Sequence, residues 1–212
     1  RDAQESRGLG DVYKRQGQIP AKPRRFAKST RGVAEPSRLV ANLPYNVAVP
    51  IFLSLLEALP SIQSATVMVQ TEVADRLAAP PGSRTYGVPS AKVSWYGEAA
   101  RGAKISRNVF WPIPNVDSAL VNFRRHGALP QPQADVAGLA LAGVSREDVF
   151  AVIDAAFAQR RKTLRAALAT WAGSAARAEG LLVVAGIDPK ARGEQLSVSE
   201  FAAIARAANT FA

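Results

Sequence analysis

The chain has 212 residues, 48% of them hydrophobic and 21% charged, which is enough apolar sequence for one medium domain and one small one. It contains no cysteine and a single histidine, so disulfides, thiolate metal sites and multi-histidine metal centres are excluded. The 27 Lys and Arg residues against 17 Asp and Glu give a net charge of +10, which favours a polyanion such as RNA as a partner. The longest apolar stretch, residues 47–59, is interrupted by polar residues. We therefore expect no membrane span, no metal and a cytoplasmic protein.

The first half of the chain has the pattern of an α/β domain. Residues 1–16 show no helical or strand periodicity and begin without Met, so we expect them to be a non-native leader. Beyond them the pattern predicts, in chain order, a strand at 38–42, a helix at 47–59, a strand at 65–70, a helix at 72–79 capped by Thr71, and strands at 99–105 and 118–125. The spacing of residues 86–96 fits either a helix or a strand. The last two strands, joined by a proline-rich turn, are predicted to form the antiparallel edge of a mostly parallel sheet.

The second half is predicted to be helical. Residues 127–144, rich in Pro, Gly and Ala, have the composition of a linker. Four helices follow: one starting at Ser145, a second that contains Leu164, Leu168 and Trp171, one at 175–185 before Gly186, and one at 199–208 after Ser197. Residues 145–212 are therefore predicted to form a small helical domain.

The tetrapeptide Asn42-Leu43-Pro44-Tyr45 directly follows the first predicted strand, where an open α/β sheet places its chemistry. An Asn side chain offers a carbonyl oxygen, and the residue before a proline holds its own carbonyl in a nearly fixed direction because it is restricted to extended geometry. Two such acceptors suit the amino group of adenine, and Tyr45 offers a face on which a flipped base can stack. The alternative is an ordinary strand-to-helix turn, with Asn42 or Asn46 capping the helix and Tyr45 packing at its edge.

Four separated blocks, from residue 36 onward, occur in an order that is hard to produce by chance. They are Asn42-Leu43-Pro44-Tyr45-Asn46, residues 70–77 with 81–83 and 86–87, residues 108–118, and residues 156–165. In these blocks the chain resembles the ribosomal RNA adenine N6-dimethyltransferase family. The resemblance is greatest to the enzymes that act on the small-subunit (16S) RNA, and bacteria that lose this enzyme become resistant to kasugamycin. The resemblance implies an α/β fold: the C-terminal part of a Rossmann-like class I methyltransferase sheet, with its first strands missing, followed by a small all-α domain.

The resemblance also implies an activity and its residues. The activity is S-adenosylmethionine-dependent dimethylation of N6 on two adjacent adenines near the 3′ end of small-subunit ribosomal RNA, by a monomer acting on the small-subunit precursor. Asn42 and the carbonyl of Leu43 would hold the target amine, with Pro44 fixing that carbonyl, and Tyr45 and Phe110 would enclose the base. A lone Phe is more often a core residue, so the role of Phe110 depends on the family block.

The donor site of this family is not recognisable ahead of Asn42. The family has a glycine-rich loop after its first strand and acidic residues after the next two. The only candidate, Gly8-Leu9-Gly10, follows a charged segment without an apolar run, so we reject it. Asn42 is then the one predicted cofactor contact. Residues 17–126 are predicted to be a partial catalytic domain, truncated at its N-terminal side, and we expect this chain by itself to be inactive.

The fourth block supplies four predicted RNA-binding residues, Arg160, Arg161, Lys162 and Arg165. Arg161 and Arg165 are four residues apart, so they share one face of a helix and could contact RNA phosphates. The alternative is that their aliphatic stems pack across the helical core while their charged ends stay in water.

Three other functions stay open. A large-subunit adenine dimethyltransferase, which confers macrolide resistance, belongs to the same class of enzyme, but residues 159–163 and the long helical tail favour the small-subunit branch. For this truncated chain a non-catalytic RNA-binding or ribosome-assembly role is the second alternative. The third is a DNA adenine methyltransferase, which uses a similar turn, but the other three blocks do not support it.

Overall fold

The computed structural model describes residues 35–127 and 143–210. The predicted leader at 1–16 and most of the predicted linker at 127–144 lie outside these residues. From Pro36 the chain forms one unit by its internal contacts, and all the elements below belong to that unit.

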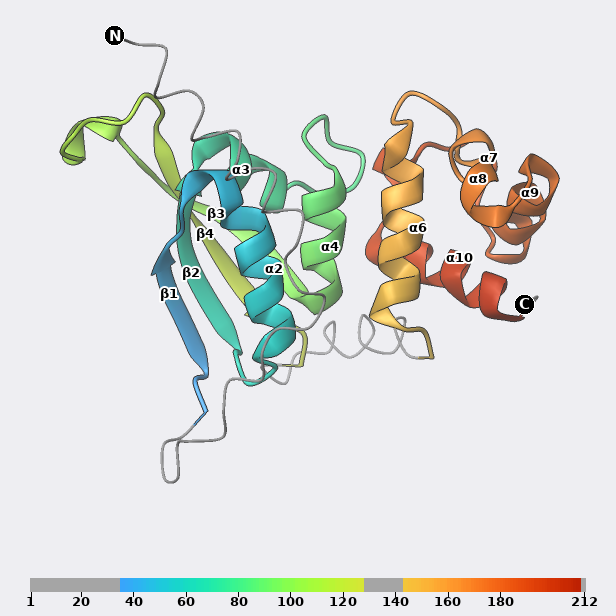
Figure 1. Ribbon diagram of the computed structural model, residues 1–212, viewed down its shortest axis with the longest axis horizontal. Coiled ribbons are helices and arrows are strands. Elements are labelled where there is room, and N and C mark those ends of the chain that lie inside the picture. The colour runs from blue at the N-terminus through green and yellow to red at the C-terminus, as the bar shows by residue number, and fades with distance from the viewer. Residues whose placement is uncertain (1–34, 128–142, 211–212) are drawn as a thin grey trace, which may run out of the picture. The chain divides into compact units, whose positions relative to one another are not determined.

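The sheet has four strands in the spatial order β1 (Arg38–Asn42), β2 (Ser64–Gln70), β4 (Ser118–Arg125) and β3 (Gly97–Ile105) (Figure 1). β1 and β2 are parallel, whereas β4 is antiparallel to both of its neighbours. The predicted antiparallel edge is therefore confirmed, but only one of the three pairings among the described residues is parallel, so this part of the sheet is mixed rather than mostly parallel. Among the described residues β1 pairs only with β2, so its other edge has no strand partner there.

Three helices share one core with this sheet: α2 (Ala48–Ala58), α3 (Thr71–Leu77) and α4 (Val88–Tyr96). Alternate residues of β2, namely Ala65, Val67 and Val69, are buried in that core. This alternation is expected for a sheet covered on one face. On the edge strand β1, Val40 exposes 83% of its surface.

Residues 86–96, which fit either a helix or a strand in the sequence, form α4. Pro89 lies in the first turn, where a helix needs no N–H donor, and the N–H of Gly87 donates to the Oγ of Ser90 at 3.1 Å. Ser90, Ala91 and Val93 are buried. The residues at the start of this segment therefore identify it as a helix, whereas its apolar spacing fits a helix and a strand equally well.

The prediction that Thr71 caps a helix is wrong. Thr71 is the first residue of α3, and its Oγ1 is buried without a hydrogen-bond partner in the part of the chain that the structure describes. Its N–H donates to the carbonyl of Asp117 at 3.0 Å. Because this bond continues the pairing of β2 with β4, strand and helix follow one another with no capping residue between them.

The helical part contains α6 (Arg146–Ala158), α7 (Leu164–Ala167), α8 (Ala169–Ala172), α9 (Ala175–Val184) and α10 (Val198–Thr210). Its predicted end signals are confirmed. The Oγ of Ser145 accepts from the N–H of Asp148 at 3.1 Å, and the N–H of Ser197 donates to the carboxylate of Glu200 at 2.7 Å, as in a capping box. Gly186 follows α9 with φ of +72°.

The helical core reaches the sheet part through Tyr86, in the segment before α4. Its ring is buried, with its centroid 6.0 Å from that of Phe157, and its hydroxyl donates to the carbonyl of Leu196 at 2.8 Å. A second link is the ion pair of Lys92, on α4, with Asp154, on α6, at 2.7 Å. A third is the ion pair of Arg146, on α6, with Glu57, on α2, at 2.5 Å, so several polar contacts join elements that are far apart in the sequence.

Candidate active site

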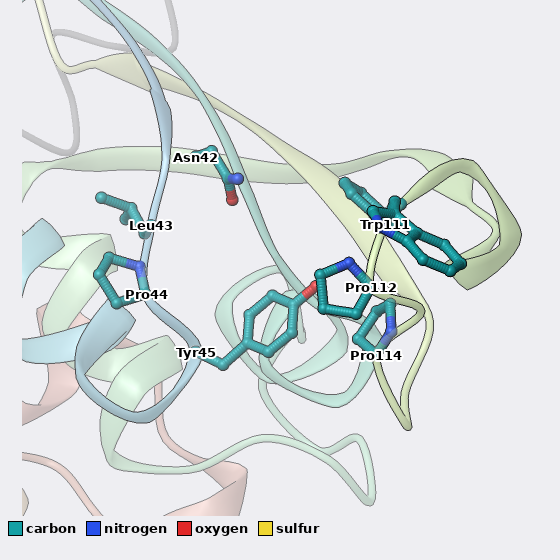
Figure 2. A pocket seen from close by; sticks show the side chains of 8 residues that line it. Asn42, Leu43, Pro44, Tyr45, Trp111, Pro112 and Pro114 are labelled. Carbon is teal, nitrogen blue, oxygen red and sulfur yellow. The ribbon is translucent and has the colours of Figure 1, made fainter.

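A pocket of about 410 Å³ lies at the carboxyl end of β1. One wall comes from the segment after β1 and the other from the β3–β4 loop, which we define as residues 106–117. The lining residues are Asn42, Leu43, Pro44, Tyr45, Phe110, Trp111, Pro112 and Pro114 (Figure 2). All five residues predicted to be catalytic line this one pocket, although Phe110 is separated from the others by more than 60 residues of sequence.

The β1 wall is held by two hydrogen bonds. The N–H of Leu43 donates to the carbonyl of Met68 at 3.1 Å, which extends the β1–β2 pairing by one residue. The hydroxyl of Tyr45 lies 2.7 Å from the Oγ of Ser118, a residue with no exposed surface. Tyr45 is thereby tied to the first residue of β4, while Asn42 stays exposed.

The capping alternative for the asparagines does not describe this turn. Neither the 3₁₀ turn η1 (Tyr45–Val47) nor α2 has a side-chain hydrogen bond at its N-terminus. The ψ of Pro44 is 129°, so the chain is extended up to the turn. Asn42 is therefore not occupied as a helix cap, and its amide is available to a ligand.

The second wall is anchored at both ends of the β3–β4 loop. The N–H of Asn108 donates to the Oγ of Ser106 at 3.3 Å, and the N–H of Arg107 donates to the carboxylate of Asp117 at 3.1 Å. Asp117 also pairs with Lys104 at 2.7 Å. The hydrogen bond from Lys104 and that from the Arg107 backbone lower the pKa of Asp117, so this carboxyl stays ionised at neutral pH. The loop that carries Phe110 is consequently fixed to the sheet.

The prediction that Arg161 and Arg165 share one face of a helix is wrong, because Arg161 lies in the turn after α6 and Arg165 lies in α7. By their partners, the four predicted RNA-binding residues divide into two pairs. Arg160 pairs with Glu194 at 3.0 Å and donates to the carbonyl of Arg84 at 2.6 Å, and Arg165 pairs with Glu179 at 2.7 Å. Arg161 and Lys162 are exposed, and within residues 35–127 and 143–210 their side chains have no partner. The two charges most available to RNA are therefore Arg161 and Lys162.

Other charged groups have structural partners. Glu72 pairs with Arg76 and Asp75 with Arg101, each at 2.5 Å. Among the described residues there is no group of acidic or histidine side chains that could hold a metal ion. In that same part of the chain no helix has the length and apolarity that crossing a membrane requires.

Sequence reasoning did not assign a role to several residues of the site. Trp111, Pro112 and Pro114 line the pocket, and Ser118 holds Tyr45. All four belong to the block at residues 108–118, so the family resemblance already pointed to this segment. Which of them point into the pocket depends on the path of the loop, and that path is set by anchors at Ser106 and Asp117.

Solved structures that share this fold include two methyltransferases. A dimethyladenosine transferase from Plasmodium falciparum has a TM-score of 0.62 at 19% identity, over 94% of this chain and 77% of that one. The 23S rRNA methyltransferase ErmE has a TM-score of 0.55 at 21% identity, over 98% of this chain and 79% of that one. These likenesses define the class by its fold, a Rossmann-like methyltransferase sheet followed by a helical part.

The chain belongs to the ribosomal RNA adenine dimethylase family, whose model matches residues 23–210. Curated relatives named ribosomal RNA small subunit methyltransferase A include that of Thermobifida fusca, 60% identical over 81% of this chain, and that of Streptomyces griseus, 62% identical over 80%. The matched region is 56% and 55% of those relatives, so the chain spans about half of their length.

Proposed function

We propose that the complete protein dimethylates N6 of two adjacent adenines near the 3′ end of small-subunit ribosomal RNA, as a cytoplasmic monomer acting on the precursor of that subunit. The observation that carries this proposal is the convergence of Asn42, Leu43, Tyr45 and Phe110 on one pocket. The names of the relatives support the small subunit over the large one. The likeness to ErmE concerns the fold alone at 21% identity.

The proposed role of these residues is to position the base. The lone pair of the adenine amine is delocalised into the ring, so the nitrogen is a poor nucleophile until acceptors hold both of its hydrogens. The Oδ1 of Asn42 and the carbonyl of Leu43 would be those acceptors, and they would stabilise positive charge as it develops on nitrogen. The rings of Tyr45 and Phe110 would enclose the two faces of the base. The hydrogen bond from Tyr45 to Ser118 would hold its ring in place before the base arrives.

The methyl donor implied by the family, S-adenosylmethionine, supplies an electrophilic methyl group. The described residues do not fit the whole donor. Asn42 is their one candidate contact, no glycine-rich turn follows any of the four strands, and the far edge of β1 is unpaired there. We therefore infer that this chain alone binds the donor weakly and transfers no methyl group. Isothermal titration with S-adenosylmethionine tests this inference, and clear micromolar binding would contradict it.

The catalytic proposal is tested in a complete enzyme, made by joining the N-terminal part of the Thermobifida fusca relative to residues 23–212 of this chain. With labelled S-adenosylmethionine we expect label in 30S precursors and not in 50S precursors. Asn42→Ala should lower the rate by about 100-fold or more, since it removes an acceptor aimed at the reacting group. Asn46→Ala, at the next exposed asparagine, is the matched control and should change the rate less than about twofold.

Two results would overturn the proposal. Label found only in 50S material would assign the large subunit. An undiminished rate in Asn42→Ala, with the double variant Asn42→Ala/Tyr45→Ala equally active, would show that this pocket does not hold the target base.

A further inference from the structure

Trp111 is an unusually exposed large side chain, with 93% of its surface accessible. Its neighbours at alternate positions, Val109 and Ile113, are also exposed, at 69% and 55%. Phe110 and Pro114, between and after them, are partly buried and line the pocket. The loop thus lines the pocket with Phe110 and Pro114 and leaves Val109 and Ile113 exposed, while Trp111 both borders the pocket and is exposed to solvent.

This exposure is maintained by the structure of the loop. Asp117 holds the N–H of Arg107, and the guanidinium of Arg107 donates to the carbonyl of Asn115 at 3.4 Å. Pro112 and Pro114 restrict the backbone on either side of Ile113. A large aromatic side chain that is held exposed beside a pocket marks Trp111 as a residue available for interaction.

The position of the loop and the net charge of the chain point to the class of ligand. Trp111 lines the rim of the base pocket, across from Leu43 and Pro44 (Figure 2). Nucleotides are covalently joined, so a base inside the pocket brings its neighbour to this rim. The β3–β4 loop carries one basic side chain, Arg107, and one acidic side chain, Asp117, so it is neutral, whereas the chain as a whole has a net charge of +10. An exposed aromatic plane on a positively charged protein is the arrangement that binds single-stranded nucleic acid by stacking.

We propose that Trp111 is the stacking platform for the nucleotide next to the target adenine. This inference rests on the proposed function. Because the substrate adenines are adjacent, one adenine would lie on Trp111 while the other occupies the pocket, and a shift of the strand by one nucleotide would bring in the second base. The exposed indole would thereby hold one adenine, separated from its RNA neighbours, beside the pocket while the other is methylated.

The test uses the chain of 212 residues and an RNA hairpin whose loop contains two adjacent adenines. Fluorescence anisotropy measures affinity. In a second hairpin, 2-aminopurine replaces the adenine beside the target, and its emission falls when it stacks. We expect the wild-type chain to bind and to quench this probe. Trp111→Ala should bind about tenfold more weakly and lose the quenching, whereas Trp111→Phe should keep most of both, since a smaller ring still stacks.

Ile113→Ala is the matched control, because it removes an exposed apolar side chain of the same loop that cannot stack. It should change affinity by less than about twofold. All three variants lie at exposed positions and should keep the thermal midpoint of the wild type.

Three other outcomes would each lead to a different conclusion. If the wild-type chain binds no RNA, the inference fails, whereas the proposed function is decided separately by the label transfer in the complete enzyme. If it binds but Trp111→Ala retains full affinity and quenching, the inference fails and the proposed function stands. If Trp111→Ala weakens capture of ribosomal proteins while naked RNA binds normally, the loop is a protein-binding surface and the inference is overturned.

Discussion

At the scale of single residues, similar side chains in one sequence block have different partners. Arg160 and Arg165 form ion pairs within the helical part, whereas the side chains of Arg161 and Lys162 have none within the described residues. Exposed ion pairs contribute little to stability, but a paired guanidinium has to give up its carboxylate before it can bind a phosphate. We therefore expect Arg161 and Lys162 to contribute more to RNA affinity than Arg160 and Arg165.

The first prediction measures this difference through salt. For the double variant Arg161→Ala/Lys162→Ala, the slope of log affinity against log salt concentration should become shallower by about 1.4 to 1.8, because two phosphate contacts are lost. Anisotropy titrations with the RNA hairpin at several salt concentrations give the slope. The double variant Arg160→Ala/Arg165→Ala, whose wild-type side chains are paired with Glu194 and Glu179, is the comparison and should change it less. Equal changes in both proteins would show that the ion pair does not limit RNA contact.

At the scale of elements, the antiparallel edge that supports the β3–β4 loop depends on a close approach between two strands. A Cβ built on Gly97, at the start of β3, would lie 2.1 Å from the carbonyl oxygen of Arg124 and 2.8 Å from the Cα of Arg125. Both atoms belong to the backbone of β4, so neither can move without separating the strands. Gly97 is required here by space rather than by backbone conformation.

The second prediction compares two glycines. Gly97→Ala should lower the free energy of unfolding by about 3 kcal/mol or more, because β3 must move away from β4. Gly180, inside α9, has nothing within 4 Å of a built Cβ. Gly180→Ala should therefore raise the free energy of unfolding by about 0.5 to 1 kcal/mol, since alanine is the better helix former. Urea unfolding followed by circular dichroism measures both. A Gly97→Ala protein as stable as the wild type would refute the packing argument.

At the scale of the whole molecule, the buried hydroxyl of Tyr86 links the sheet part to the helical part by its bond to Leu196. Burial, with a smaller contribution from the charge of Glu200, raises the pKa of Tyr86 above its ordinary value of 10.0. A raised pKa in the folded state means that this group stabilises the fold fully below pH 10 and loses that contribution as the pH rises further.

The third prediction follows from this hydrogen bond. Tyr86→Phe should lower the free energy of unfolding by about 1 to 2 kcal/mol at pH 7, because the carbonyl of Leu196 is left buried without its donor. The difference from the wild type should stay constant up to pH 10 and shrink above it, since only the wild type titrates there. Urea unfolding between pH 7 and about pH 11 measures the difference. A difference that persists unchanged at the alkaline end would mean that the Tyr86 hydroxyl is not protected by burial.

What the sequence determined by itself is local. Strand periodicity gave the bounds of β1 and β4 without error, and Ser145 and Ser197 marked helix starts, because alternation and capping are properties of a few neighbouring residues. The segment from Asn42 to Tyr45 could be singled out for the same reason: a strand end, an amide and a proline are adjacent in the chain.

What the tertiary structure alone decided is which distant residues meet. No local pattern shows that Tyr45 is held by Ser118, that Phe110 and Trp111 reach the end of β1, or that Arg160 is occupied by Glu194. The start of α3 without a capping residue likewise depends on the bond from Thr71 to Asp117, across the sheet. These contacts depend on strand order and loop anchoring, which bring together groups far apart in the chain. Where such a hydrogen bond is buried, the low dielectric constant of the interior makes it stronger than it would be in water.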